Sequence, residues 1–192
     1  MKVGLWGGTF DPPHVGHQLV ASDAAETLGL DLVLWVPAAT QPFKAGLPGT
    51  AASHRLAMVQ RAVAGDARFA ADEVEIARGG LSFTIDTLRA LRQRQPGTDW
   101  VLLVGADAFR GFARWRSPDV IAGMATVAVL TREGAGADDA ALAAVPGAIQ
   151  LPVRRVDVSS TEVRARVRTG RSLRGFVTEP VAAYIAEHGL YR

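Results

Sequence analysis

Residues 2–17 have the sequence KVGLWGGTFDPPHVGH, and this stretch decides the fold class. The apolar run at 2–6 predicts a buried strand, and Gly7 and Gly8 end that strand. Two glycines allow a sharp turn and a close approach of the backbone to a ligand. A helix is expected to follow the turn, from about residue 16 to residue 28. A buried strand, a tight turn and a helix together form the first unit of an α/β fold.

The same alternation continues along the chain. Further apolar runs predict strands at 31–36, 100–104 and 125–130, with a short extended stretch at 68–76. Helical patterns occur at 51–64, 84–95, 159–167 and 180–187, and 134–147 is expected to be a surface excursion. Strands without polar alternation indicate a parallel sheet that helices cover on both faces. We therefore expect a doubly wound α/β fold with ligands at the carboxyl ends of its strands.

Length and composition narrow the class of protein. A chain of 192 residues, 48% apolar and 21% charged, suits one domain over residues 1–192. It contains no cysteine, which excludes disulfides and thiolate chemistry. A net charge of +2 is too small to attract nucleic acid or an anionic membrane through a strong overall electrostatic field. Because no apolar window approaches the roughly 18 residues of a membrane span, we expect a soluble, cytoplasmic protein.

Two of the four histidines, His14 and His17, stand three residues apart where the first helix is expected to begin. Both side chains can therefore face one point near the helix N-terminus, which favours phosphate. Histidine N–H groups can follow charge that develops on a phosphoryl group. A metal site is the weaker interpretation, because no third histidine or cysteine lies nearby and no metal ligand is predicted.

A second anion site is predicted at residues 159–164. The S-x-x-E pattern from Ser159 to Glu162 is a capping box that opens a helix, and capping is one sufficient role for it. Arg164, one turn later, adds guanidinium donors that bind phosphate oxygens. Taken alone, the segment fits a cap and an anion site equally well. Together with the two histidines, it favours triphosphate binding.

The remaining candidates follow the strand at 100–104. Asp107 can either cap the next short helix or accept hydrogen bonds from ribose hydroxyls. Trp115 is a partly buried surface residue or a flat face for an electron-poor ring. The other tryptophans, Trp6, Trp35 and Trp100, lie in or beside apolar runs and are expected in the core.

Residues 7–17 closely resemble the GGTFDPxHxGH signature of the nucleotidylyltransferase superfamily. Four further segments are similar to bacterial nicotinate mononucleotide adenylyltransferases. They are PAATQPFK at 37–44, SFTIDTL at 82–88, GAD at 105–107 followed by Trp115, and VSSTEVR at 158–164. The ending at 184–191 is also similar, so the resemblance covers essentially the whole chain. It implies a single Rossmann-like nucleotidylyltransferase domain.

The resemblance also implies a reaction, in which the phosphate of nicotinate mononucleotide attacks the α-phosphorus of ATP and pyrophosphate leaves. Mg²⁺ is the implied cofactor. The implied catalytic residues are His14, His17 and Arg164. The implied ATP-binding residues are Gly8, Thr9, Phe10, His14, His17, Gly105, Asp107, Ser160, Thr161 and Arg164. The implied acceptor-binding residues are Lys44, Phe83, Thr84 and Trp115, and Phe43 stands before Lys44 where many relatives have histidine.

Two other functions stay open. Phosphopantetheine adenylyltransferases share the His-x-Gly-His turn, and a non-catalytic ATP-binding module would also use it. RNA binding is disfavoured, because no basic stretch is interleaved with aromatic residues. His54, Arg55 and His188 are expected to be surface or helix-end charges without a chemical role. The sequence leaves the oligomeric state open, a homo-oligomer included.

Overall fold

The computed structural model describes residues 1–42, 49–132 and 139–192. Its centre is a six-stranded sheet with the order β3-β2-β1-β4-β5-β6, and every neighbouring pair is parallel. The strands are β1 (Lys2–Gly8), β2 (Leu32–Pro37), β3 (Phe69–Ala71), β4 (Asp99–Gly105), β5 (Thr126–Arg132) and β6 (Ile149–Val153). This order confirms the doubly wound fold. The direction of winding reverses between β1 and β4, where such folds bind ligands.

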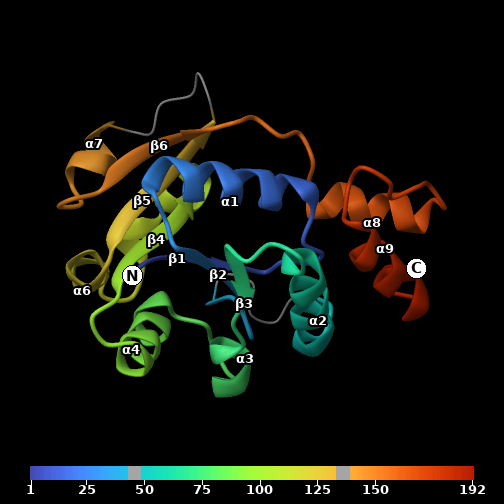
Figure 1. Ribbon diagram of the computed structural model, residues 1–192, viewed down its shortest axis with the longest axis horizontal. Coiled ribbons are helices and arrows are strands. Elements are labelled where there is room, and N and C mark those ends of the chain that lie inside the picture. Colours follow the sequence, from blue (N-terminus) through green and yellow to red (C-terminus); the bar gives the residue numbers. More distant parts are fainter. Residues whose placement is uncertain (43–48, 133–138) are drawn as a thin grey trace.

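Helices cover both faces of the sheet (Figure 1). On one face α1 (Val15–Leu28) packs its small residues Ala21, Ala24 and Ala25 against the strands. On the other face α4 (Thr84–Arg94) and α6 (Pro118–Met124) bury Leu88 and Ile121. The shorter elements are α3 (Val74–Arg78), α5 (Ala106–Phe109), the 3₁₀ helix η2 (Phe112–Arg114) and α7 (Asp139–Ala143).

Besides the packing on the two faces of the sheet, a third group of buried apolar side chains joins the C-terminal part of the chain to α2 (Ala52–Val63). There α8 (Ser160–Arg168) and α9 (Glu179–Glu187) lie together at one end of the molecule, beside α2 (Figure 1). Val163, Val181 and Ile185 pack with Met58 of α2. Because α8 and α9 pack on α2 rather than on the strands, they extend the fold past the carboxyl ends of the sheet.

The three tryptophans that were expected in the core are buried there. Trp35 and Trp100 are fully buried, and Trp6 is 9% exposed. Among the described helices, none has the length and apolar character that a membrane span requires.

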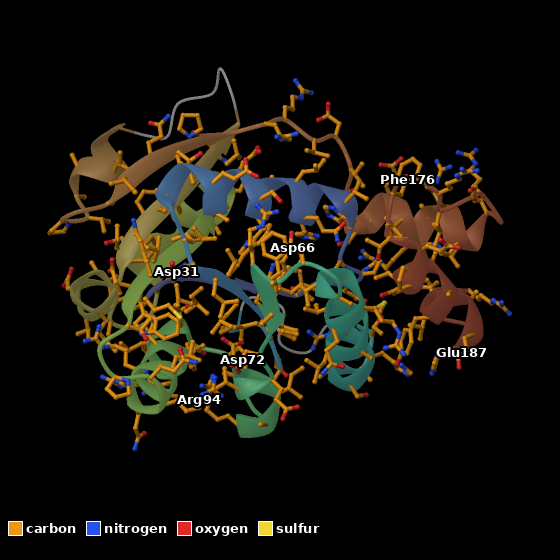
Figure 2. The ribbon with its side chains drawn as sticks, viewed as in Figure 1. Asp31, Asp66, Asp72, Arg94, Phe176 and Glu187 are labelled. Atoms are coloured by element: carbon orange, nitrogen blue, oxygen red, sulfur yellow. The ribbon has the colours of Figure 1, made fainter. Side chains whose placement is uncertain are left out.

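Two segments differ from the sequence-based expectation. The stretch at 68–76 is extended only as β3, because the Asp72 carboxylate accepts a hydrogen bond from Val74 N at 2.9 Å and the chain then turns into α3. Asp72 also forms an ion pair with Arg94 of α4, and both residues are labelled in Figure 2. Strand β6 was not predicted. It contains Pro152 and lies at the edge of the sheet, where the N–H that proline lacks is not needed.

Candidate active site

A cavity of about 470 Å³ opens at the carboxyl ends of β1 and β4. This is the position that the doubly wound fold predicts, and the size suits a small-molecule ligand. Six of the described site residues expected from the sequence line the cavity: Gly8, Phe83, Thr84, Gly105, Asp107 and Trp115. The structure therefore brings together three segments that are far apart in the sequence.

The histidine turn, residues 7–17, connects β1 to α1. His14 is the N-cap of α1 and His17 lies in its first turn, so the two rings lie 3.7 Å apart. The backbone N–H of His14 donates to Nδ1 of His17 over 3.1 Å. Because Nδ1 of His17 accepts this bond, a neutral His17 carries its proton on Nε2. The turn thus fixes which nitrogen of His17 can donate to a ligand.

Burial sets the charge of both histidines. It lowers the pKa of His14 from 6.5 to about 4. Burial, and after it the nearby His14, lower the pKa of His17 well below 6.5. Without a ligand, both imidazoles are therefore neutral at pH 7 and act as directed N–H donors. A bound polyphosphate would favour their protonated forms.

Aromatic side chains pack against the ring of His17. The ring of Phe10 stacks on Trp35, with 5.3 Å between centroids, and the His17 ring meets the edges of Phe10 and Trp6 at 5.1 and 5.7 Å. Phe10 has a φ of 49° and is only 3% exposed. The Phe10 ring therefore belongs to the buried packing around His17 and Trp35. A Cβ on Gly8 would lie 2.9 Å from the Phe10 ring, so packing alone requires glycine there.

The N-terminus of α8 lies against the histidine turn. Ser159 caps α8 by accepting a hydrogen bond from Glu162 N at 3.1 Å, as its sequence pattern predicts. The next residue, Ser160, donates to Pro12 O at 2.8 Å. Arg164 donates to Asp11 O at 2.7 Å and to Thr161 Oγ1 at 3.2 Å. The predicted anion site on α8 and the predicted histidine pair are therefore neighbours.

A backbone bond also holds the start of α1 in place. Val15 N donates to Phe176 O at 2.9 Å. Phe176, labelled in Figure 2, lies between α8 and α9, and its ring supports the Arg166 guanidinium at 3.9 Å. The C-terminal segment thus contacts the histidine turn at more than one point.

The opposite side of the cavity is aromatic and basic. Trp115 packs on Phe112 with 5.1 Å between centroids, and the Arg116 guanidinium lies 5.1 Å from the Phe83 ring. Arg110, Arg114 and Arg116 all line the cavity. Thr84 is the first residue of α4 and lines the cavity, so the N-terminus of that helix lies on this side.

Asp107 lies inside α5, whose N-cap is Gly105. The alternative role of Asp107 as a cap is therefore wrong. Its carboxylate is exposed and bonds to Arg110 at 2.8 Å. Lys44, the expected contact of the acceptor loop, and Phe43, which stands before it where many relatives have histidine, lie outside the described residues.

Arg55, which was expected to be a surface charge without a role, is buried. Its guanidinium donates to the carbonyls of Thr50, Thr9 and Ala39 at 2.9–3.0 Å. It joins the histidine turn, the end of β2 and the start of α2. Burial lowers the pKa of Arg55, and nearby Asp11 opposes that shift. The helical spacing from Arg55 to Met58, Val59 and Ala62 was the signal that placed it on the buried face of α2.

The other two residues that were assigned no role form a separate cluster. His54 is half-buried, and its Nδ1 lies 2.8 Å from the hydroxyl of Tyr184. His188 ends α9 and stacks on Tyr184, with 4.0 Å between ring centroids. This cluster lies on α2 and α9, away from the cavity lining.

Known proteins of one kind match this chain over most or all of its length. Residues 5–166 match the model of the cytidylyltransferase-like family. A Gemmatimonas aurantiaca protein named probable nicotinate-nucleotide adenylyltransferase is 51% identical, over 100% of this chain and 93% of its own. A Thermus thermophilus protein of the same name is 43% identical over the full length of both chains. The fold also matches Plasmodium falciparum nicotinic acid mononucleotide adenylyltransferase complexed with NaAD, with a TM-score of 0.82, 16% identity, and coverage of 99% of this chain and 97% of that one.

Proposed function

The chain belongs to the cytidylyltransferase-like family, and on that premise we propose that it transfers the adenylyl group of ATP to nicotinate mononucleotide. The products are nicotinate adenine dinucleotide and pyrophosphate. One observation carries the proposal: hydrogen bonds from Ser160 to Pro12 and from Arg164 to Asp11 join a second helix N-terminus to the histidine turn, at the edge of an aromatic and basic cavity. That arrangement suits two phosphorylated substrates side by side.

ATP is assigned to the histidine turn and α8. Two helix N-termini, those of α1 and α8, present the positive ends of their dipoles to the phosphates. His17 adds its Nε2 proton, and Arg164 adds a guanidinium. Thr9, Phe10 and Gly8 contribute backbone, and Thr161 lies beside Arg164. These groups stabilise the charge that develops on the α-phosphoryl group and on the leaving pyrophosphate.

The acceptor phosphate needs no general base, because it is already ionised at neutral pH. Catalysis then depends on holding the attacking oxygen in line with the α-phosphorus, and on the donors placed around it. His14, His17 and Arg164 are assigned these catalytic roles. Their neutral or cationic N–H groups match the charge that moves from the attacking to the leaving oxygen.

Nicotinate mononucleotide is assigned to the cavity. Trp115 and Phe83 offer flat faces to the pyridinium ring, and the N–H groups at the start of α4, near Thr84, suit its carboxylate. The cavity lining contains three arginines against Glu75 and Asp107, a balance that favours an anionic acceptor. Asp107 is placed after β4, where it can accept bonds from ribose hydroxyls, and Gly105 leaves room beside it. Lys44 stays a proposed contact of the acceptor phosphate.

Adenylyl transfer from ATP generally implies a divalent metal, and we assign Mg²⁺ to this role. The described residues contain no group of three or more His, Asp or Glu side chains that could hold a metal ion. Mg²⁺ commonly binds through the phosphate oxygens of its nucleotide and through water, and we assign it that mode here. When bound, Mg²⁺ would neutralise phosphate charge.

We also propose that residues 1–192 form one domain, because contacts join the C-terminal residues to the rest of the fold. The family model ends at residue 166, but the packing of α9 on α2 and the bond from Val15 to Phe176 tie the later residues to the histidine turn. The alternative acceptor, phosphopantetheine, has neither an aromatic ring to stack on Trp115 and Phe83 nor a carboxylate for the N–H groups at the start of α4.

The test is pyrophosphate release from ATP and Mg²⁺ with nicotinate mononucleotide, nicotinamide mononucleotide or phosphopantetheine. We expect rapid release with the nicotinate form, much less with the amide, and none above background with phosphopantetheine. Chromatography identifies the dinucleotide product. Equal rates with the two pyridine nucleotides would overturn the assignment of the carboxylate site. Tight ATP binding with no release from any acceptor would favour a non-catalytic module.

A further inference from the structure

Asp11 of the histidine turn is bonded to Tyr191, which lies 180 residues away in the sequence. The Tyr191 hydroxyl donates to Asp11 Oδ1 at 2.6 Å. The other carboxylate oxygen of Asp11 accepts from Thr50 N at 3.4 Å. Tyr191 has a φ of 67°, a left-handed conformation that residues other than glycine rarely adopt. Such a conformation persists only where surrounding contacts determine it.

The main chain of Asp11 carries a second set of contacts. Its carbonyl accepts the bond from Arg164, and the carbonyl of the next residue, Pro12, accepts the bond from Ser160. A rotation of Asp11 would therefore change the position of Arg164 and of the α8 N-terminus. It would also move the start of α1, because His14 follows Asp11 by three residues.

We propose that Tyr191 is a positioning residue, which acts through Asp11 to hold His14, His17 and Arg164 in register with each other. The kinetic part of this inference rests on the proposed adenylyl transfer. Tyr191 itself need not touch a substrate. Burial raises the pKa of the Tyr191 phenol, which keeps the hydroxyl protonated as a donor over the working pH range.

The chain supplies a matched control. Its other tyrosine, Tyr184, lies in α9, and its hydroxyl also makes one short bond, 2.8 Å long, to Nδ1 of His54. The substitutions Tyr191→Phe and Tyr184→Phe each remove one hydroxyl and keep the ring. Tyr191→Phe acts on the histidine turn, whereas Tyr184→Phe acts on the cluster of His54 and His188.

The kinetic experiment compares these variants at saturating ATP. We expect Tyr191→Phe to lower kcat about tenfold, the effect of one lost bond to a charged group, and to leave KM for the acceptor within about twofold. Tyr184→Phe should leave kcat within about twofold. In an Asp11→Ala background, Tyr191→Phe should lower kcat by less than about a further twofold, because its partner is gone. Equal losses from the two tyrosine variants, or full additivity with Asp11→Ala, would overturn the proposal.

A second readout does not depend on turnover. The four histidines form two pairs, His14 with His17 and His54 with His188. In ¹H–¹³C imidazole spectra, Tyr191→Phe should shift the first pair and Tyr184→Phe the second. Unchanged signals from His14 and His17 in folded Tyr191→Phe would overturn the proposal. If the wild-type protein transferred no adenylyl group, the proposed function would fail, whereas these spectra would still test the positioning role.

Discussion

The backbone N–H of His14 donates to Nδ1 of His17, and the two rings lie 3.7 Å apart at the N-terminus of α1. This bond leaves Nε2 as the donor nitrogen of neutral His17. It also fixes the ring against Phe10 and Trp6, so no side-chain freedom has to be lost when a phosphate binds. The pair is a donor site prepared by the fold itself.

Replacement of His17 tests that role. His17→Ala should lower kcat about 10²- to 10³-fold, the range for loss of one prepared donor, and should weaken ATP binding far less. Steady-state kinetics and calorimetric titration with ATP measure the two effects. His188→Ala, at the far end of α9, is the control and should keep wild-type turnover. Near-wild-type turnover in folded His17→Ala would remove this histidine from the mechanism.

The lowered pKa of His14 predicts a dependence of stability on pH. Its pKa is about 4 in the folded protein and 6.5 in the unfolded chain, so between these values the unfolded state binds more protons. The free energy of unfolding should therefore fall as pH decreases from 6.5 to 4, by at most about 3 kcal/mol from this group. Urea titrations at several pH values measure the slope. His14→Gln should flatten it and His188→Gln should not, and equal slopes in the two variants would contradict the assignment.

The two glycines that end β1 should respond differently to a methyl group. In Gly8→Ala the new Cβ would lie 2.9 Å from the Phe10 ring, and the resulting strain should cost about 1–3 kcal/mol of stability. In Gly7→Ala the Cβ meets no atom within 4 Å, and Gly7 lines the cavity. That variant should keep its stability and raise KM. Thermal unfolding and kinetics of the two proteins provide the test, and a stable Gly8→Ala would contradict this account of the turn.

Arg55 should contribute to stability more than Arg61 of the same helix. Arg55→Met leaves three carbonyls without their donor and should lower the free energy of unfolding by about 3 kcal/mol. The Arg61 guanidinium donates to the Ala57 carbonyl, one turn back in α2, and stacks on Tyr184. Arg61→Met should therefore cost less than about 1 kcal/mol. Denaturant titration measures both, and equal losses would argue against the bridging role of Arg55.

Acceptor preference should depend on Arg116. Arg116 and Arg89 both contact Asp86, at 3.4 and 3.6 Å, but only Arg116 of these two lines the cavity. Arg116→Gln should lower kcat/KM for nicotinate mononucleotide several-fold, which corresponds to roughly 1 kcal/mol for a partly exposed charge. The kcat/KM for nicotinamide mononucleotide should change much less. Arg89→Gln should alter neither. A parallel loss with both acceptors would show that Arg116 does not discriminate between them.

Much of the site could be predicted from local sequence. The histidine pair and the Ser159 cap each depend on residues three apart, and a helix start places such residues together. The cavity residues Phe83 and Thr84 came from a resemblance to a known family, whereas Trp115 was also a candidate from the residues alone, and all three line one cavity. Arg55 was missed because its three partners are carbonyls, which every residue carries and no pattern marks.

The sequence alone determined the fold class, because apolar strands without polar alternation must be covered on both faces, and only a helix-wrapped parallel sheet does that. It also determined where two helices begin, since capping is local. Only the tertiary structure decided that β6 completes the sheet edge, that Ser160 and Arg164 bond the histidine turn, and that Tyr191 holds Asp11. These last contacts join residues 148 to 180 positions apart, and their geometry exists only once the sheet has brought the distant segments to one edge.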